Sequence, residues 1–242
     1  MDHMKFLGNT LGDIARQKAG ILKPGRPAVS IWQHKAALEE IMAKAKEQGS
    51  LLRILDPEEI TRVRYGLEKQ SFDYGGFRRL EITLAGKYQV ENAALAVETL
   101  KMLGEWGFSV SEEALRKGLR ETAWPGRFSV IAKKPYFIVD GAHNEDGAKL
   151  LAESGSFYFT NRRIIYIMGV LRDKDHQGII ALSHSLADQI ITVTPPDNPR
   201  ALSAYELAQE AARVHENVTA ADSLEEAVEM SRMLAGKEDV II

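Results

Sequence analysis

The sequence has 242 residues, which is enough for one large domain or two domains of ordinary size. Apolar residues make up 45% and charged residues 27%, as in soluble globular proteins, and the net charge of -3 gives no electrostatic basis for binding nucleic acid or an anionic membrane. The absence of cysteine excludes disulfides and thiolate catalysis, and no apolar run is long enough to span a membrane. We therefore expect a soluble, cytoplasmic protein with neither nucleic acid nor membrane as a partner.

The first half of the chain predicts a mixture of helices and strands. Apolar periodicity, cap residues and a Gly-Gly turn mark the elements. They are a helix from Thr10 to Gly20, a strand at Ala28–Trp32, a helix at Lys35–Glu47, a hairpin of Ser71–Tyr74 and Phe77–Leu84, and a helix at Gln89–Leu103.

The second half predicts short apolar strands that alternate with helices, which is typical of βαβ units and a parallel sheet. Two of the helices begin with a predicted capping box, Ser203 with Glu206 and Ser223 with Glu226. The predicted strands are Tyr136–Val139, Ile164–Met168, Gln189–Val193 and Asp239 to the end. The Trp124-Pro125-Gly126 segment predicts a boundary between a domain of residues 1–124 and a domain of residues 125–242.

Three candidate site residues lie in the first half. Helical spacing places Lys18 on the same face as Leu11, Ile14 and Ala15, and an unpaired ammonium is costly to bury. Alternatively, Lys18 extends to solvent at the helix C-terminus, where a cation suits the helix dipole. His3 is either a metal ligand or a frayed terminal residue, and Asn92 is either a ligand-binding residue or a polar residue in solvent.

The most informative segment runs from residue 124 to residue 147. Its apolar strand ends in Asp140-Gly141-Ala142-His143-Asn144, at the edge where open α/β sheets bind ligands. Arg127 follows a Pro-Gly turn at the predicted junction, where a guanidinium can reach a phosphate. Arg127 and Asp140 can also serve as a salt bridge across the boundary, and His143 can be structural.

Two further polar segments, residues 169–175 and residues 194–200, follow the next two strands. Three polar loops at one sheet edge favour a binding site. The sequence lacks the phosphate-binding G-x-x-x-x-G-K-[ST] motif, since Gly86-Lys87 is followed by Tyr88, and it lacks the G-x-G-x-x-G, H-E-x-x-H and G-x-S-x-G motifs.

Taken in order, six blocks resemble the folylpolyglutamate synthase/dihydrofolate synthase family of the Mur ligase superfamily. The blocks are DHMKFLGNTLGDIARQKAGILKPG, KYQVENAALAV, WPGRF, FIVDGAHNEDG, IMGVLRDKD and VTPPDNPRALSAYEL. They cover nearly the whole chain. The resemblance implies an α/β fold, in which the remainder of a Mur-ligase-type ATPase domain precedes a Rossmann-like C-terminal domain with a mainly parallel sheet.

The resemblance also implies site residues. His3 matches a magnesium-binding histidine, and Lys18 matches a lysine that is carbamylated, which would give a carboxylate suited to Mg²⁺. Asn92, Arg127 and Asp140 match residues that bind ATP. His143 matches a histidine near the reacting groups.

The implied reaction is ATP-dependent amide ligation. A carboxylate of dihydropteroate or of a folate would take the γ-phosphoryl group, and the amine of L-glutamate would displace phosphate from the acyl phosphate. The family's N-terminal half, with its phosphate-binding loop, is absent from this sequence. We therefore expect the 242-residue chain to be inactive alone. The resemblance also implies that the full-length ligase is a monomer.

Two alternatives stay open from the sequence. The first is another Mur-type ligase that adds a different amino acid, for example to a peptidoglycan precursor. The second is a non-catalytic module that binds a nucleotide or a partner protein.

Overall fold

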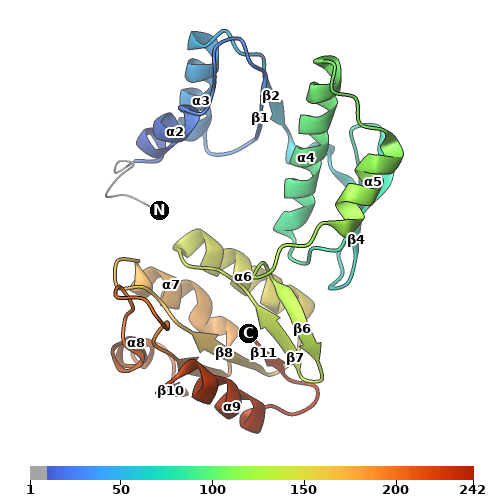
Figure 1. The fold of residues 1–242 in the computed structure, drawn as a ribbon. Coiled ribbons are helices and arrows are strands. Elements are labelled where there is room, and N and C mark those ends of the chain that lie inside the picture. Colours follow the sequence, from blue (N-terminus) through green and yellow to red (C-terminus); the bar gives the residue numbers. More distant parts are fainter. Residues whose placement is uncertain (1–9) are drawn as a thin grey trace. The chain divides into compact units, whose positions relative to one another are not determined.

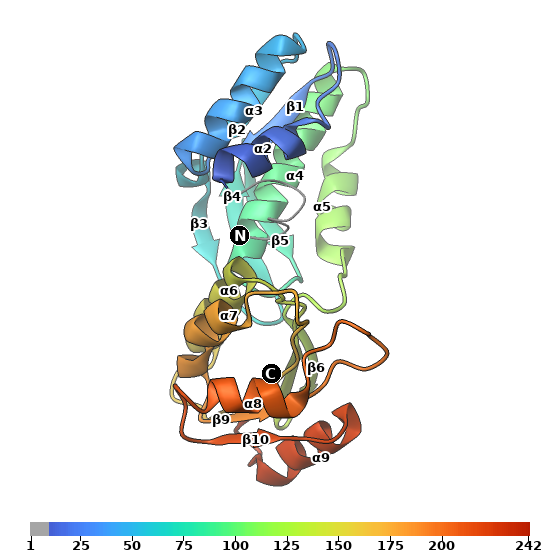
Figure 2. The same cartoon turned by 90° about the vertical axis from the view of Figure 1, so that its left-hand side faces the viewer.

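The computed structural model describes residues 10–242. The chain divides into two compact units, Met1–Ala123 and Trp124–Ile242, each with a hydrophobic core of its own. Figures 1 and 2 show the elements of each unit, which are described separately below. No helix among residues 10–242 has the length and apolar character to cross a membrane.

The first unit begins with a pair of helices and a short parallel sheet. Thr10 accepts a hydrogen bond from the Asp13 amide, and the Asp13 carboxylate accepts one from the Thr10 amide, so the first helix starts with a capping box. The elements are α2 (Leu11–Ala19), β1 (Ala28–Ile31), α3 (Lys35–Glu47) and β2 (Leu52–Leu55), with β1 parallel to β2.

A three-stranded antiparallel sheet with order β3-β4-β5 follows in the same unit. One face of this sheet is apolar and packs through Phe72 and Leu80 into a core shared with Val97 and Leu115. The elements are η1 (Pro57–Glu59), β3 (Thr61–Arg64), β4 (Gln70–Tyr74), β5 (Phe77–Ile82), α4 (Tyr88–Glu105) and α5 (Glu112–Glu121). Gly75 and Gly76, both at positive φ, form the predicted hairpin turn.

The second unit is built on a six-stranded sheet with order β10-β9-β8-β11-β7-β6. Its strands are β6 (Ser129–Lys133), β7 (Tyr136–Val139), β8 (Ile164–Met168), β9 (Gln189–Thr192), β10 (Val218–Ala220) and β11 (Val240–Ile241). All are parallel except β6, which is antiparallel to β7. The predicted mainly parallel sheet is therefore confirmed, whereas β6 and β10 were not predicted.

Helices cover both faces of this sheet. The helices are α6 (Glu145–Tyr158), α7 (His176–Ser183), the short η2 (His184–Leu186), α8 (Ala204–Ala211) and α9 (Leu224–Leu234). Helix α9 packs through Ala227 onto Ile165 and Ile191, whereas Thr192, which alternates with Ile191, donates to the Ala204 carbonyl at the start of α8. Helices α8 and α9 therefore lie on opposite faces.

The two predicted capping boxes of this unit have different outcomes. At α8, Ser203 and Glu206 form the reciprocal pair, as predicted. At α9, Ser223 accepts from the Glu226 amide, but the Glu226 carboxylate accepts from the Asp222 amide instead of the Ser223 amide. The second box was therefore predicted wrongly, although Ser223 is a helix cap.

Candidate functional site

The loop after β7 is tied to the turn that precedes β6 by the carboxylate of Asp140. Asp140 Oδ2 accepts from the Phe128 amide at 2.7 Å, and Oδ1 accepts from the Ala142 amide at 2.8 Å. The Gly141 amide donates to the Gly126 carbonyl at 2.8 Å, a further link between the two segments. Asp140 thus holds the Trp124–Phe128 turn against the carboxyl end of the sheet.

The turn itself has an unusual backbone. Gly126 lies at φ 77° and Phe128 at φ 47°, and the latter is uncommon for a bulky residue. The Phe128 side chain is buried and packs on Tyr158 and Phe159, with ring centroids 5.7 and 6.4 Å away. Arg127, which lies between Gly126 and the buried Phe128, is exposed. No hydrogen bond or ion pair among residues 10–242 engages its guanidinium.

The same loop supplies the start of α6. Asn144 caps this helix, since its Oδ1 accepts from the Gly147 amide at 2.7 Å. His143 is exposed, and its Nδ1 lies 2.8 Å from the Gly141 carbonyl, so Nδ1 carries a proton and donates it to that carbonyl. Arg127, Asp140 and His143 therefore share one edge of the second unit.

The loops after β8 and β9 are joined to each other at this edge. Leu171 and Ala201 form an isolated antiparallel bridge, and the Arg172 amide donates to the Arg200 carbonyl at 2.7 Å. Arg172 also binds the carboxylate of Glu206 through two hydrogen bonds, at 3.2 and 2.9 Å. These contacts organise the two loops that the sequence assigned to the carboxyl edge.

Lys18 lies on the exposed side of α2. The buried residues of α2 are Ala15 and Ala19, whereas Leu11 is 41% exposed and Lys18 is exposed. Of the two interpretations that the sequence left open for Lys18, the described residues fit the exposed one and not the buried one. Lys18 instead lies in the last turn of α2, the alternative in which the cation faces solvent at the C-terminal end of the helix.

Asn92 lies one turn into α4 and is exposed. Its side-chain amide donates to Gln89 Oε1 at 3.1 Å, while Gln89 itself is 6% exposed. His3 lies outside the described residues. Asn92 and Lys18 belong to the first unit, so the structure brings together three of the six predicted residues, namely Arg127, Asp140 and His143.

The structural roles of Asp175 and Gly178 at this edge were not identified from the sequence. Asp175 caps α7 by accepting from the Gly178 amide at 2.9 Å, and a Cβ at Gly178 would come within 3.0 Å of Glu145 Cγ. The starts of α6 and α7 are thus packed together. An Asp three residues before Gly178 was a readable cap signal in the sequence.

An open, mainly parallel sheet with polar loops at the carboxyl ends of its strands defines a class of α/β protein that binds ligands at that edge. Residues 126–242 match the family model described as "Mur ligase, glutamate ligase domain". The second unit is therefore a glutamate ligase domain of the Mur ligase family.

Curated relatives narrow the resemblance within that family. The chain is 35% identical over 212 residues to the dihydrofolate synthase/folylpolyglutamate synthase of Bacillus subtilis, a match that covers 85% of the chain and 49% of the relative. It is 33% identical over 220 residues to the folylpolyglutamate synthase of Lacticaseibacillus casei, covering 87% and 51%. The chain thus spans about half the length of these relatives.

Solved structures agree with the sequence comparison. Mycobacterium tuberculosis folylpolyglutamate synthase complexed with ADP matches with a TM-score of 0.89 and 26% identity, over 100% of this chain and 58% of that one. E. coli FolC in complex with DHPP and ADP matches with a TM-score of 0.83 and 28% identity, over 100% and 55%. The α/β fold and the relationship to folylpolyglutamate synthases, both expected from the sequence, are confirmed.

Proposed function

We propose that this chain supplies part of an ATP-dependent ligase that adds L-glutamate to a folate, with dihydropteroate as a second acceptor. The observation that carries the proposal is the Asp140 junction, which presents Arg127 and His143 at the carboxyl edge of the second unit. The names of the relatives support the choice of folate and glutamate. The bound ADP of two structural neighbours supports the choice of nucleotide.

The residues at the junction fit the roles that a nucleotide requires. The exposed guanidinium of Arg127 is a bidentate donor suited to phosphate oxygens. Each Asp140 oxygen accepts one backbone N–H, and a carboxylate has further lone pairs with which to accept from a ribose hydroxyl. Asn92 is a third candidate for the nucleotide, from the first unit.

His143 suits a role near the reacting groups because it is exposed and its orientation is set. The hydrogen bond from Nδ1 to the Gly141 carbonyl fixes the imidazole ring and its tautomer. In the proposed reaction the acceptor carboxylate displaces ADP from the γ-phosphorus to form an acyl phosphate. The glutamate amine then attacks the acyl carbon, loses a proton and releases inorganic phosphate.

Magnesium is a weaker fit to the described residues. Among residues 10–242, no three His, Asp or Glu side chains lie close enough together to hold a metal ion. Lys18 would add a carboxylate only if it is carbamylated, and its exposure means that burial does not favour that reaction. A magnesium site with His3 and carbamylated Lys18 therefore rests on the family resemblance, and we derive no step from it.

A chimera tests the proposed function directly. In the Bacillus subtilis relative, the region that this chain matches is replaced by this chain, and incorporation of labelled glutamate into a folate is measured with ATP. We expect incorporation with glutamate that exceeds incorporation with alanine or lysine by at least about tenfold. A folded chimera that ligates another amino acid, or none while the parent enzyme works, contradicts the proposal. The 242-residue chain alone is the control, which we expect to show no turnover.

A further inference from the structure

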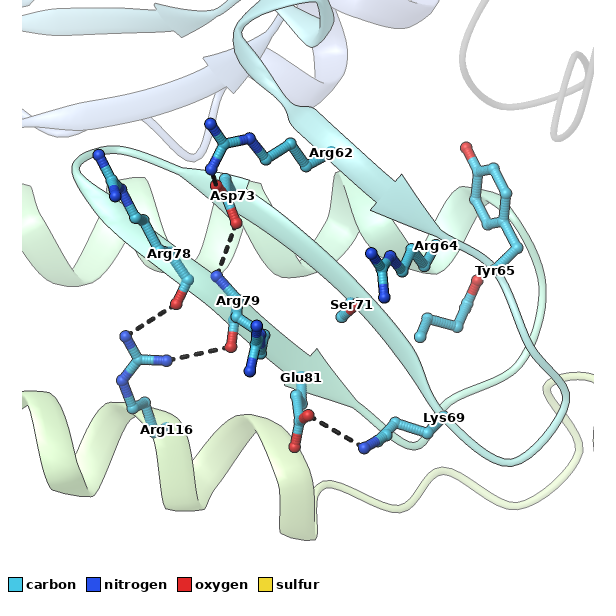
Figure 3. Close-up of a pocket in the computed structure, with 11 residues that line it drawn as sticks. Arg62, Arg64, Tyr65, Lys69, Ser71, Asp73, Arg78, Arg79, Glu81 and Arg116 are labelled. Atoms are coloured by element: carbon cyan, nitrogen blue, oxygen red, sulfur yellow. Dashed lines mark hydrogen bonds and ion pairs between the residues drawn. The ribbon is translucent and has the colours of Figure 1, made fainter.

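The outer face of the antiparallel sheet in the first unit is a cationic hollow. Side chains from β3, β4, β5 and α5 surround an open space of about 1000 Å³ (Figure 3). Six of its eleven lining residues are Arg or Lys and two are Asp or Glu, so the hollow is strongly positive although the chain carries a net charge of -3. The cations are Arg62, Arg64, Lys69, Arg78, Arg79 and Arg116.

Two irregularities in the strand pairing shape this face. On β3, residues 62–63 lie opposite Phe72 alone, and on β5, residues 78–79 lie opposite Asp73 alone, so each outer strand carries an extra residue. Each bulge contains an arginine at positive φ, Arg62 at 51° and Arg79 at 52°. Backbone strain of this kind persists where surrounding contacts hold it, and it concentrates at binding sites.

Asp73, on the central strand, holds both bulges. Its Oδ2 lies 3.3 Å from Arg62 Nη1, and its Oδ1 accepts from the Arg79 amide at 2.6 Å. From α5, Arg116 donates to the carbonyls of Arg78 and Arg79 at 3.0 and 3.1 Å (Figure 3). Asp73 and Arg116 bind backbone atoms of Arg78 and Arg79 on β5. These contacts position the two arginines but do not engage their guanidinium groups.

Several cations of the hollow are consequently uncommitted. Lys69 pairs with Glu81 and Arg62 pairs with Asp73. No acidic side chain among residues 10–242 pairs with Arg64, Arg78 or Arg79, and all three are exposed. Arg64 lies opposite Ser71, a small residue that leaves the floor between β3 and β5 open.

We propose that this hollow binds the oligo-γ-glutamyl tail of the folate product, an inference that rests on the proposed function. Guanidinium groups bind carboxylates through paired hydrogen bonds, and each tail residue carries one free α-carboxylate. Neighbouring strands lie about 4.8 Å apart and alternate residues of a strand about 7 Å apart, so the arginines form an extended array. A flexible chain of regularly spaced carboxylates complements an array better than a single compact anion does.

The test measures binding of synthetic penta-γ-L-glutamate to the 242-residue chain by calorimetry at low ionic strength. The test variants are Arg64→Gln and the double variant Arg64→Gln/Arg79→Gln. The charge-matched control is Arg26→Gln/Arg232→Gln, which changes two exposed arginines outside the hollow. Circular dichroism confirms that each variant is folded, and Arg64→Gln alone leaves both strained positions unchanged.

We expect the pentaglutamate to bind, the double variant to bind about tenfold more weakly, and the control to bind within about twofold of the original chain. Absence of binding, or equal weakening in the control, overturns the proposal. Equal affinity for inorganic phosphate or for α-linked pentaglutamate also overturns it, because the hollow would then be a general anion surface. The assay needs neither ATP nor ligation, so a failed ligase assay beside intact, specific binding counts against the proposed function and not against the hollow.

Discussion

Asp140 and Phe128, twelve residues apart, are joined by a hydrogen bond of 2.7 Å from the Phe128 amide to Asp140 Oδ2. Phe128 is at positive φ and the residue is only 1% exposed, so its amide is held within the fold. This hydrogen bond joins the turn that precedes β6 to the end of β7. It also fixes the position of the exposed Arg127, the residue before Phe128.

We expect Asp140→Asn to loosen this junction. An asparagine has one acceptor oxygen where the aspartate uses two, so one of the two backbone amides loses its partner, at a cost of about 2 kcal/mol. Amide hydrogen exchange measured by NMR should become about thirtyfold faster at Phe128 or Ala142, since 1.4 kcal/mol corresponds to a factor of ten.

The control for this prediction is Glu229→Gln, which removes one charge from an exposed position of α9. Exchange at Phe128 and Ala142 should not change in that variant. Unchanged exchange in Asp140→Asn as well would mean that the carboxylate does not hold the turn.

Glu206 predicts a local dependence on pH. Hydrogen bonding to Arg172, then to the hydroxyl and the amide of Ser203, lowers the pKa of Glu206 to about 2 from an ordinary value of 4.5. Because the pKa is lowered in the folded chain, the stabilisation is complete above pH 4.5 and is lost as the pH falls towards 2.

An NMR titration of the Glu206 carboxyl carbon measures this effect. In Arg172→Gln the titration should move towards pH 4.5, because the largest contribution is removed. Arg200→Gln is the control, since Arg200 pairs with Asp173 instead. Equal titration in all three chains would show that Arg172 does not bind Glu206.

In the first unit, Glu98 is a nearly buried carboxylate with three donors. Glu98 Oε2 accepts from Tyr74 at 3.0 Å and from Lys101 at 3.2 Å, and Arg53 lies 3.3 Å from Oε1. Burial, then the hydrogen bond to Glu98, raises the pKa of Tyr74. This tyrosine therefore stays protonated and donates at neutral pH.

We expect Tyr74→Phe to lower the free energy of unfolding by about 1 kcal/mol, since the carboxylate loses one donor but keeps two cations. Urea unfolding followed by circular dichroism measures the change. Tyr205→Phe, at a position that is 68% exposed, should change it by less than about 0.5 kcal/mol. If Tyr74→Phe lowers the free energy of unfolding no more than Tyr205→Phe does, the hydrogen bond from Tyr74 to Glu98 does not stabilise the fold.

The second unit was predictable because its signals are local. Apolar strands that end in polar loops identified β7, β8 and β9, and the loop of Asp140 was placed correctly at the carboxyl edge. Strands β6 and β10 were missed. Both lie at the edges of the sheet, where one side is unpaired, Ser129–Lys133 is polar at its ends, and β10 has only three residues. Edge strands need less apolar character than central ones.

The first unit shows what sequence periodicity leaves undetermined. Spacing placed Lys18 on one face with Leu11, Ile14 and Ala15. Of these residues α2 buries Ala15 alone, together with Ala19, whereas Leu11 and Lys18 are exposed. The cationic hollow depends on two bulges that turn arginines onto one face of a sheet. Bulges arise from strand pairing between distant residues, and the alternation of residue types along one strand does not reveal them.

We propose that the Asp140 junction presents Arg127 to the nucleotide of a ligase, and a kinetic comparison of two arginine variants tests this most directly. In the Bacillus subtilis chimera, KM for ATP is measured with Arg127→Gln and with Arg213→Gln, an exposed arginine elsewhere in the second unit. We predict that Arg127→Gln raises KM for ATP by about ten- to a hundredfold, the loss expected for a charge-assisted hydrogen bond, while Arg213→Gln has no effect. Equal KM values for the two variants and the parent chimera would contradict the account.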